Sequence, residues 1–291
     1  MSRAPDSDRL PQSVALGVLV AAALLLIAAG IAIHAAGLDA AWLLRVHAQA
    51  PGRAAVTVWS CITVLGLGWT PLILVPATDR SRGEITALLL PTFVLGTLFT
   101  HLPKWLLASP RPAATPLLAQ LHVIGDAFRG PVSMPSGHAL TAAALAALLW
   151  LAFPRRRALA AGLGLALFAG VVGWSRVVVG AHWPADVFCG AGLGLVAVAV
   201  PLAAGRAAWI GRLQQRFVAA IRSRTGQRWV ALIEIAAGAG LLHEHTGYPA
   251  GNAMVVLLAS VATVSAALRW DATSQRRALR REPGDAPGEP T

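Results

Sequence analysis

Long apolar runs, separated by short polar stretches, make up most of this chain. The first run, VALGVLVAAALLLIAAGIAI, covers residues 14–33. Seven further runs follow it, near residues 54–77, 85–107, 138–153, 158–179, 185–204, 229–243 and 250–268. Because a helix that crosses a bilayer needs about 20 apolar residues, the pattern predicts eight membrane-spanning helices. The fourth and seventh runs are the shortest.

The composition agrees with a membrane protein. Of the 291 residues, 56% are hydrophobic and 13% are charged, whereas a soluble domain has about 45–50% apolar and about 25% charged residues. The first run is longer than the roughly 7–15 apolar residues of a signal peptide, so we expect it to remain as an anchor. Cys61 and Cys189 lie in apolar runs and form no disulfide or zinc pattern.

The net charge of +11 is distributed unevenly along the chain. With eight spans and a cytoplasmic N-terminus, 18 of the 24 basic residues fall in cytoplasmic segments and six on the outer side. This asymmetry follows the positive-inside rule, which explains the basic charge without a nucleic-acid partner. We therefore expect both termini in the cytoplasm. The six outer residues are Arg45, Arg53, Lys104, Arg111, Arg129 and Arg176.

Three polar clusters lie at the outer ends of the predicted spans. They are KWLLASPRP at residues 104–112, which contains the chain's only lysine, PSGH at residues 135–138, and SRVVVGAHWPAD at residues 175–186. A charge at a span end is unfavourable unless it is paired or hydrated, so the basic residues in these clusters need an explanation.

The residue types in the clusters suit a tetrahedral phosphate dianion. Arg111 and Arg176 each have a planar guanidinium group that can bind two phosphate oxygens at once, and Lys104 adds a compact positive charge. Ser136 suits the N-cap of a helix, and Gly137 lets the free N–H groups at that helix start approach an anion. These five residues are our candidate phosphate ligands.

Two histidines complete the clusters. His182 has Asp186 four residues later, so on a helix the carboxylate can orient the imidazole ring. His138, in the PSGH cluster, has no such partner. One oriented histidine and one without a carboxylate predict a nucleophile, His182, and a general acid, His138.

Each cluster alone has an ordinary explanation. A Lys–Arg pair at a span end commonly snorkels to the interface, SGH commonly begins a helix, and a His and an Asp four residues apart commonly form a structural pair. Three such clusters in order on one predicted face of the membrane favour a common site.

The three motifs, K-x6-RP, PSGH and SR-x5-H-x3-D, resemble those of the type 2 phosphatidic acid phosphatases. This superfamily includes lipid phosphate phosphatases and vanadium-dependent haloperoxidases. The resemblance covers about residues 85–204 and every defining position of the motifs. It implies a six-helix membrane core and hydrolysis of phosphomonoesters or diphosphates without a metal or cofactor.

The resemblance also implies roles for the same residues. Lys104, Arg111 and Arg176 would hold the phosphate with Ser136 and the Gly137 N–H. His182 would attack phosphorus and form a phosphohistidine, Asp186 would orient His182, and His138 would protonate the leaving oxygen.

The predicted architecture is an all-α, polytopic transmembrane bundle with a six-helix core and two extra C-terminal spans. The segments follow the charge pattern: a cytoplasmic tail (1–12), the membrane core (13–204, with the motifs within 104–186), a basic amphipathic cytoplasmic segment (205–228), a C-terminal membrane hairpin (229–270) and a disordered tail (271–291). For 205–228, an ordinary solvated connector is the alternative.

Two further features carry ionisable groups near or within the last spans. His243, Glu244 and His245 are adjacent, but neighbours on a helix point about 100° apart, so we predict an outer turn rather than a metal site. Glu234 lies inside the seventh run with no evident partner, and we leave it out of the candidate site.

We therefore expect an integral phosphatase of a bacterial inner membrane that acts on a lipid phosphate or diphosphate at the periplasmic face. Undecaprenyl diphosphate is the favoured substrate, with phosphatidylglycerophosphate, phosphatidic acid and lipid A phosphate as alternatives. A lipid phosphotransferase would use the same residues. A non-catalytic transporter or lipid-binding scaffold would need neither an acid nor a nucleophile. The sequence pattern does not indicate an oligomeric state.

Overall fold

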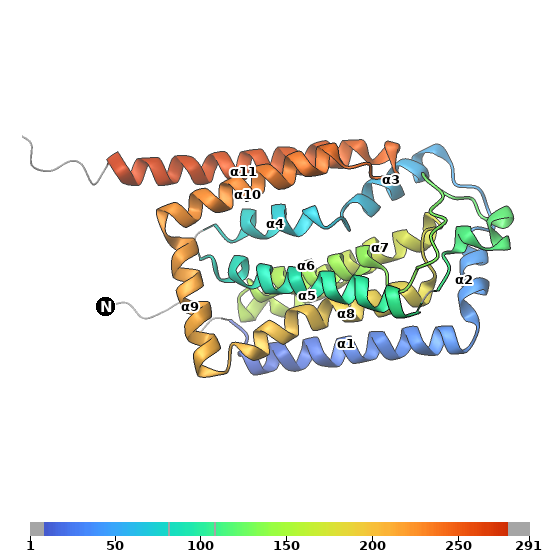
Figure 1. The fold of residues 1–291 in the computed structure, drawn as a ribbon, viewed down its shortest axis with the longest axis horizontal. Coiled ribbons are helices and arrows are strands. Elements are labelled where there is room, and N and C mark those ends of the chain that lie inside the picture. Colours follow the sequence, from blue (N-terminus) through green and yellow to red (C-terminus); the bar gives the residue numbers. More distant parts are fainter. Residues whose placement is uncertain (1–8, 81, 108, 279–291) are drawn as a thin grey trace, which may run out of the picture.

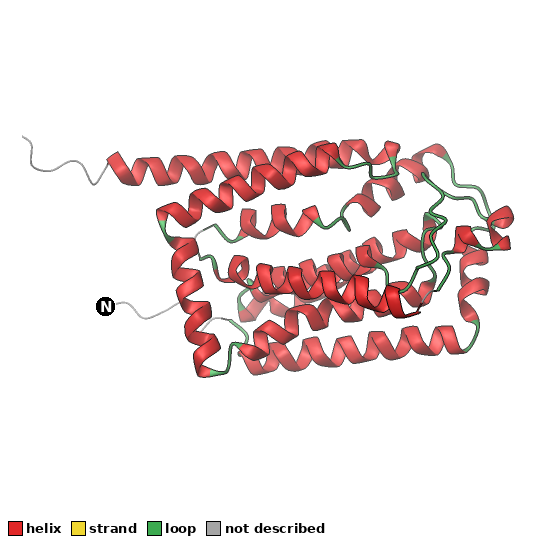
Figure 2. Ribbon diagram, viewed as in Figure 1, coloured by secondary structure: helices red, strands yellow, loops and turns green. Residues whose placement is uncertain are grey.

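The computed structural model describes residues 9–80, 82–107 and 109–278, and its regular elements are helices (Figure 2). Eleven α-helices and three short 3₁₀ helices cover these residues, which confirms the all-α class. Five of the α-helices are long and apolar enough to cross a membrane: α1 (Gln12–Ala35), α5 (Glu84–Leu107), α7 (Arg155–Val178), α8 (Pro184–Ala204) and α11 (Asn252–Ala278).

The second apolar run is broken rather than continuous. It forms α3 (Arg53–Val64) and α4 (Trp69–Thr78), which are bent by 72° and together count as a sixth possible span. The break falls at Gly66 and Gly68, because glycine loses more backbone freedom in a helix than any other residue.

The two shortest predicted spans are α6 (Gly137–Leu151) and part of α10 (Arg224–His243). Helix α6 has 15 residues, below the length of a full span, and α10 carries Arg228 and Glu234 among its apolar residues. By length and composition, the described residues therefore support five or six of the eight predicted spans.

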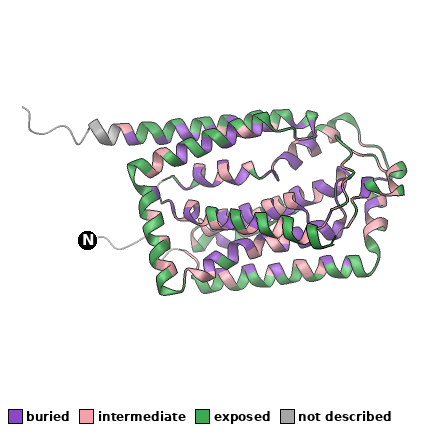
Figure 3. Ribbon diagram, viewed as in Figure 1, coloured by how far each residue is buried: buried purple, intermediate pink, exposed green. Residues whose placement is uncertain are grey.

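The outer faces of the long helices are apolar. Leu25 on α1 is 72% exposed, and Leu163 and Leu167 on α7 are 65% and 69% exposed (Figure 3). Side chains of this size are stable at a surface that contacts lipid. With the number of long apolar helices, this identifies the chain as a multi-pass membrane protein.

Helix α6 lies within the bundle and packs against α5, α7 and α8. Two glycines of α8 allow its close approach to α6. A Cβ atom on Gly190 would lie 2.4 Å from the carbonyl oxygen of Ser136, and one on Gly194 would lie 2.3 Å from that of Leu140. Small residues give membrane helices this kind of backbone contact. The contact places the start of α8 directly beside the PSGH motif.

The loops gather at the two ends of the bundle (Figure 1). One end, here called the site end, holds α2 (Leu38–Val46), the segment between α5 and α6 with its 3₁₀ helices η2 (Pro112–Ala114) and η3 (Pro116–Gln120), and the α10–α11 turn with η4 (Pro249–Gly251). The opposite end holds α9 (Ala208–Arg222), within the segment predicted as a basic amphipathic helix. Helix α1 begins and α11 ends at the α9 end.

Glu234 has a buried partner that the sequence pattern did not indicate. Its Oε2 lies 3.1 Å from Nε of Arg269 on α11, and Ser265 donates a 2.6 Å hydrogen bond to Oε1. Arg269 also donates to the carbonyl oxygen of Pro76 on α4, at 2.7 Å. This network ties α10 and α11 to the rest of the bundle.

The two predicted tails lie only partly within the described residues. Helix α11 continues to Ala278, so residues 271–278 of the predicted disordered tail are helical. Residues 279–291, and residues 1–8 of the N-terminal tail, lie outside the described residues.

Candidate active site

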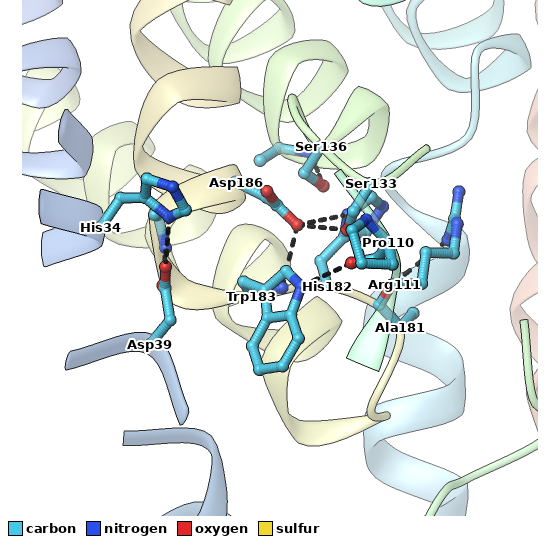
Figure 4. A network of polar contacts seen from close by, with 12 residues as sticks. His34, Asp39, Pro110, Arg111, Ser133, Ser136, Ala181, His182, Trp183 and Asp186 are labelled. Atoms are coloured by element: carbon cyan, nitrogen blue, oxygen red, sulfur yellow. Dashed lines mark hydrogen bonds and ion pairs between the residues drawn. The ribbon is translucent and has the colours of Figure 1, made fainter. Parts of the chain in front are cut away.

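The structure brings the three sequence clusters together at the site end. Lys104 lies in the last turn of α5, Arg176 in the last turn of α7, and His138 in the first turn of α6. Arg111 follows α5 in the loop, and His182 and Asp186 lie around the start of α8 (Figure 4). Residues up to 82 positions apart therefore share one region.

The end of α7 explains how Arg176 and His182 come together. The carbonyl oxygen of Arg176 accepts hydrogen bonds from the backbone N–H groups of Ala181 and His182, at 3.0 and 3.2 Å. Gly180, with φ of 77°, makes the left-handed turn that closes the helix. The segment from Arg176 to His182 therefore folds back on itself.

His182 and Asp186 form the predicted pair, and both are almost fully buried. Nδ1 of His182 lies 3.2 Å from Oδ2 of Asp186, although His182 precedes α8 and Asp186 is in its first turn. The backbone N–H of Trp183 donates to the same carboxylate oxygen at 3.0 Å. Asp39 of α2 accepts a further hydrogen bond from the N–H of Ala185, at 2.9 Å. These contacts fix the start of α8 and the imidazole ring together.

Ser133 belongs to this network, and the sequence reasoning missed it. Its hydroxyl donates to Oδ2 of Asp186, and its oxygen lies 3.3 Å from Nδ1 of His182 (Figure 4). A carboxylate oxygen accepts hydrogen bonds, so the network assigns the ring proton of His182 to Nδ1. Nε2 then carries the lone pair, and it has no hydrogen-bond partner among the described residues.

The electrostatics of the site favour a neutral His182. Burial lowers the pKa of its imidazole well below the ordinary value, and the nearby cations Arg111, Arg176 and Lys104 lower that pKa further. Each effect acts against a positive charge on the ring. A neutral ring keeps the Nε2 lone pair available for reaction.

Arg111 is held by backbone contacts on two sides. Its N–H donates to the carbonyl oxygen of Gly130 at 3.2 Å, and its guanidinium donates to that of Ala181 at 3.2 Å. The guanidinium carbon lies 5.6 Å from the ring centre of Phe128. Because Ala181 precedes His182 directly, this contact places a cation beside the candidate nucleophile.

Arg176 is buried and has two side-chain partners that the sequence motifs do not contain. Its Nη1 donates to Oγ1 of Thr63 on α3 and to the hydroxyl of Tyr248 in the α10–α11 turn, the latter at 2.9 Å. Its Nε is buried without a partner among the described residues. No local pattern could have revealed these contacts, since 113 and 72 positions separate the residues.

Ser136 and Gly137 have the local geometry expected of a helix start. Ser136 is the N-cap of α6, and its hydroxyl accepts a 3.5 Å hydrogen bond from the N–H of Ala139. Its own N–H donates to the carbonyl oxygen of Asp186 at 2.9 Å. Ser136 is therefore buried and engaged in capping, which still leaves its hydroxyl proton as a donor.

His138 lies on the wall of a cavity of about 400 Å³. Gly66, at the break between α3 and α4, packs on His138, since a Cβ there would lie 2.7 Å from Cβ of the histidine. Thr100 of α5 and Thr141 of α6 also line this cavity. A group bound in the cavity would therefore contact the candidate acid.

Acidic and histidine side chains do not gather into a metal site in the part of the chain that the structure describes. The adjacent Glu244 and His245 have separate partners. Glu244 accepts a hydrogen bond from the indole of Trp69, and Nε2 of His245 lies 2.8 Å from a carboxylate oxygen of Asp126. Glu244 and His245 lie in a turn between α10 and α11, and its side of the membrane stays a prediction.

The chain is similar to a known protein family and to a solved structure. Residues 85–209 match the sequence model of the PAP2 superfamily, a segment that contains all three motifs. The crystal structure of Aquifex aeolicus LpxE is similar to part of this structure. The match covers 56% of this chain and 93% of the LpxE chain, with 23% sequence identity and a TM-score of 0.49. No curated protein matches the chain.

Proposed function

We propose that this chain is a membrane phosphatase of the PAP2 superfamily that needs no metal and cleaves lipid phosphates or diphosphates through a phosphohistidine on His182. One observation carries the proposal. The network of Asp186 and Ser133 holds Nδ1 of His182, while Nε2 is unpaired and three cations lie nearby.

In the first step, Lys104, Arg111 and Arg176 bind the phosphate oxygens and draw negative charge away from phosphorus. The Nε2 lone pair of His182 forms a bond to phosphorus as the bond to the lipid oxygen breaks. His138 donates its proton to that leaving oxygen. Asp186 stabilises the positive charge that develops on the His182 ring.

In the second step, water replaces the lipid. His138, now neutral, takes a proton from the water, and the oxygen bonds to phosphorus as the N–P bond breaks. Inorganic phosphate leaves, His182 recovers its lone pair, and His138 recovers its proton. The cycle uses the residues of the site, the substrate and one water molecule.

The surroundings favour a lipid substrate. The candidate acid faces a cavity that begins at the break between α3 and α4 and is also lined by Leu89 and Phe93 of α5. A headgroup can thus reach the site from an apolar environment. Within this class undecaprenyl diphosphate is our favoured substrate, and phosphatidylglycerophosphate, phosphatidic acid and lipid A phosphate are the alternatives. The positive-inside rule supports a site end that faces the periplasm of a bacterial inner membrane.

Phosphate release by the purified protein from these four lipids, in detergent, tests the function. We expect release from at least one of them, and its loss in His182→Asn, which keeps the size and polarity of the side chain. An acceptor lipid that gains phosphate faster than water does would instead identify a phosphotransferase. Failure to release phosphate from any of the lipids, or undiminished release by His182→Asn, would contradict the proposal.

A further inference from the structure

We propose that Tyr248 is a positioning residue of the phosphate site, and that through it the C-terminal hairpin of α10 and α11 completes a site whose motifs lie elsewhere. This rests on the proposed function, in which Arg176 binds phosphate. Tyr248 is only 2% exposed and lies outside residues 85–209, the segment that matches the superfamily.

The contact between Tyr248 and Arg176 is specific in two ways. The tyrosine hydroxyl accepts a 2.9 Å hydrogen bond from Nη1 of Arg176. The guanidinium carbon also lies 5.4 Å from the centre of the tyrosine ring, within the range of a cation–π interaction. The ring and the hydroxyl therefore act on the same guanidinium.

The donors of Arg176 show what this contact leaves open. A guanidinium has five N–H donors, two of them on Nη1. Tyr248 and Thr63 take up the two on Nη1. Nε is buried and has no partner among the described residues, and buried donors are normally paired. Tyr248 thus fixes one side of the guanidinium and leaves the Nε side for an anion.

The turn that carries Tyr248 is itself fixed against the loop between α5 and α6. The N–H of Asp126 donates to the carbonyl oxygen of Gly247 at 2.9 Å. Gly125 and Gly247 have φ values of 73° and 77°, and a Cβ on Gly125 would lie 2.2 Å from that carbonyl oxygen. Only glycine permits so close an approach at position 125.

The same turn also supports the second arginine. The ring of Phe128 lies 6.1 Å from the ring of Tyr248, centre to centre, and 5.6 Å from the guanidinium carbon of Arg111. Tyr248 therefore contacts Arg176 directly, and it contacts Arg111 indirectly through Phe128.

The test compares Tyr248→Phe with His245→Ala in the full-length protein. The first removes only the hydroxyl; the second alters the same turn at a side chain that is 85% exposed. KM and kcat are measured on a soluble phosphomonoester, and the inhibition constant of vanadate is measured in the same assay. The assay temperature is well below the melting temperature of either variant. For Tyr248→Phe we expect KM and the vanadate constant to rise about tenfold, the size of one hydrogen bond to a charged group, with kcat within about twofold.

His245→Ala should match the parent in all three quantities. Unchanged KM and vanadate constants in Tyr248→Phe would overturn the inference, and so would equal losses in the two variants, because the hydroxyl would then have no special part. Arg176→Ala separates the inference from the function on which it rests. It should lose vanadate inhibition altogether; if it does not, the assignment of Arg176 to the phosphate is wrong, and the role of Tyr248 falls with it.

Discussion

The hydroxyl oxygen of Ser133 lies 3.3 Å from Nδ1 of His182, although 49 positions separate the two residues. Both contact the same carboxylate oxygen of Asp186. Ser133 therefore belongs to the network on the side of the imidazole ring opposite the nitrogen that we propose as the nucleophile.

Replacing Ser133 by alanine should lower kcat about tenfold and leave KM within about twofold. The variant loses a hydrogen bond to a charged acceptor, about 1.5 kcal/mol, and with it part of the orientation of the ring. Steady-state kinetics measure the change. Ser260→Ala is the control, because its exposed hydroxyl donates to the carbonyl oxygen of Val256 in its own helix. An unchanged kcat in Ser133→Ala would contradict the role given to the network.

The buried Glu234–Arg269 pair should be important for stability. Glu234→Gln leaves the guanidinium of Arg269 buried without a counter-ion, which costs about 3–5 kcal/mol and should lower the melting temperature in detergent by several degrees. Glu84→Gln is the matched control. Glu84 pairs with Arg9 and Arg222 but is 36% exposed, so its loss should cost less than about 1 kcal/mol. Equal shifts in the melting temperature of the two variants would contradict the special importance of the buried pair.

Part of this structure was predictable because hydropathy and short motifs are local properties. The apolar runs predicted α1, α5, α7, α8 and α11, and the order of the motifs predicted that Lys104, Arg111 and Arg176 would lie at one end of the bundle. A hydrophobic run does not reveal where a helix bends. The break at Gly66, which packs on His138, was therefore missed.

The missed site residues share one property, which is that each acts across a long stretch of sequence. Thr63 reaches Arg176 from α3, Tyr248 reaches it from the α10–α11 turn, and Ser133 reaches Asp186 from a loop. Serine, threonine and tyrosine are common residues, and no spacing rule links them to a partner more than 50 positions away. Arg269, the partner of Glu234, was missed because it lies 35 positions away on another helix.

Excess EDTA should leave activity unchanged, and vanadate should inhibit it. The proposed phosphate ligands are the cations Lys104, Arg111 and Arg176, so no divalent ion is needed to neutralise the substrate. Vanadate can adopt the trigonal bipyramidal geometry of phosphoryl transfer and so bind as a transition-state analogue. Release of phosphate is measured with each reagent. Loss of activity in EDTA that a divalent ion restores would overturn the metal-free mechanism.

The orientation in the membrane can be tested at the two ends of the bundle. Single cysteines replace Gln120, which is exposed on η3 at the site end, and Gln215, which is exposed on α9, in a chain that lacks Cys61 and Cys189. In intact cells, an impermeant maleimide should label position 120 and spare position 215. The reverse result would place the site end in the cytoplasm, and labelling at both positions would mean that the spans were miscounted.

A covalent phosphate on His182 is the central claim of this account, and trapping it is the most direct test. The purified protein is mixed with substrate that carries a labelled phosphate, stopped in alkaline detergent and digested. We expect label that is stable in base and lost in acid, on the peptide that contains His182. His182→Ala should hold no label and retain less than about 1% of the parental turnover, since the loss of a covalent nucleophile costs several orders of magnitude. Label on another peptide, or turnover by the alanine variant above that level, would contradict the account.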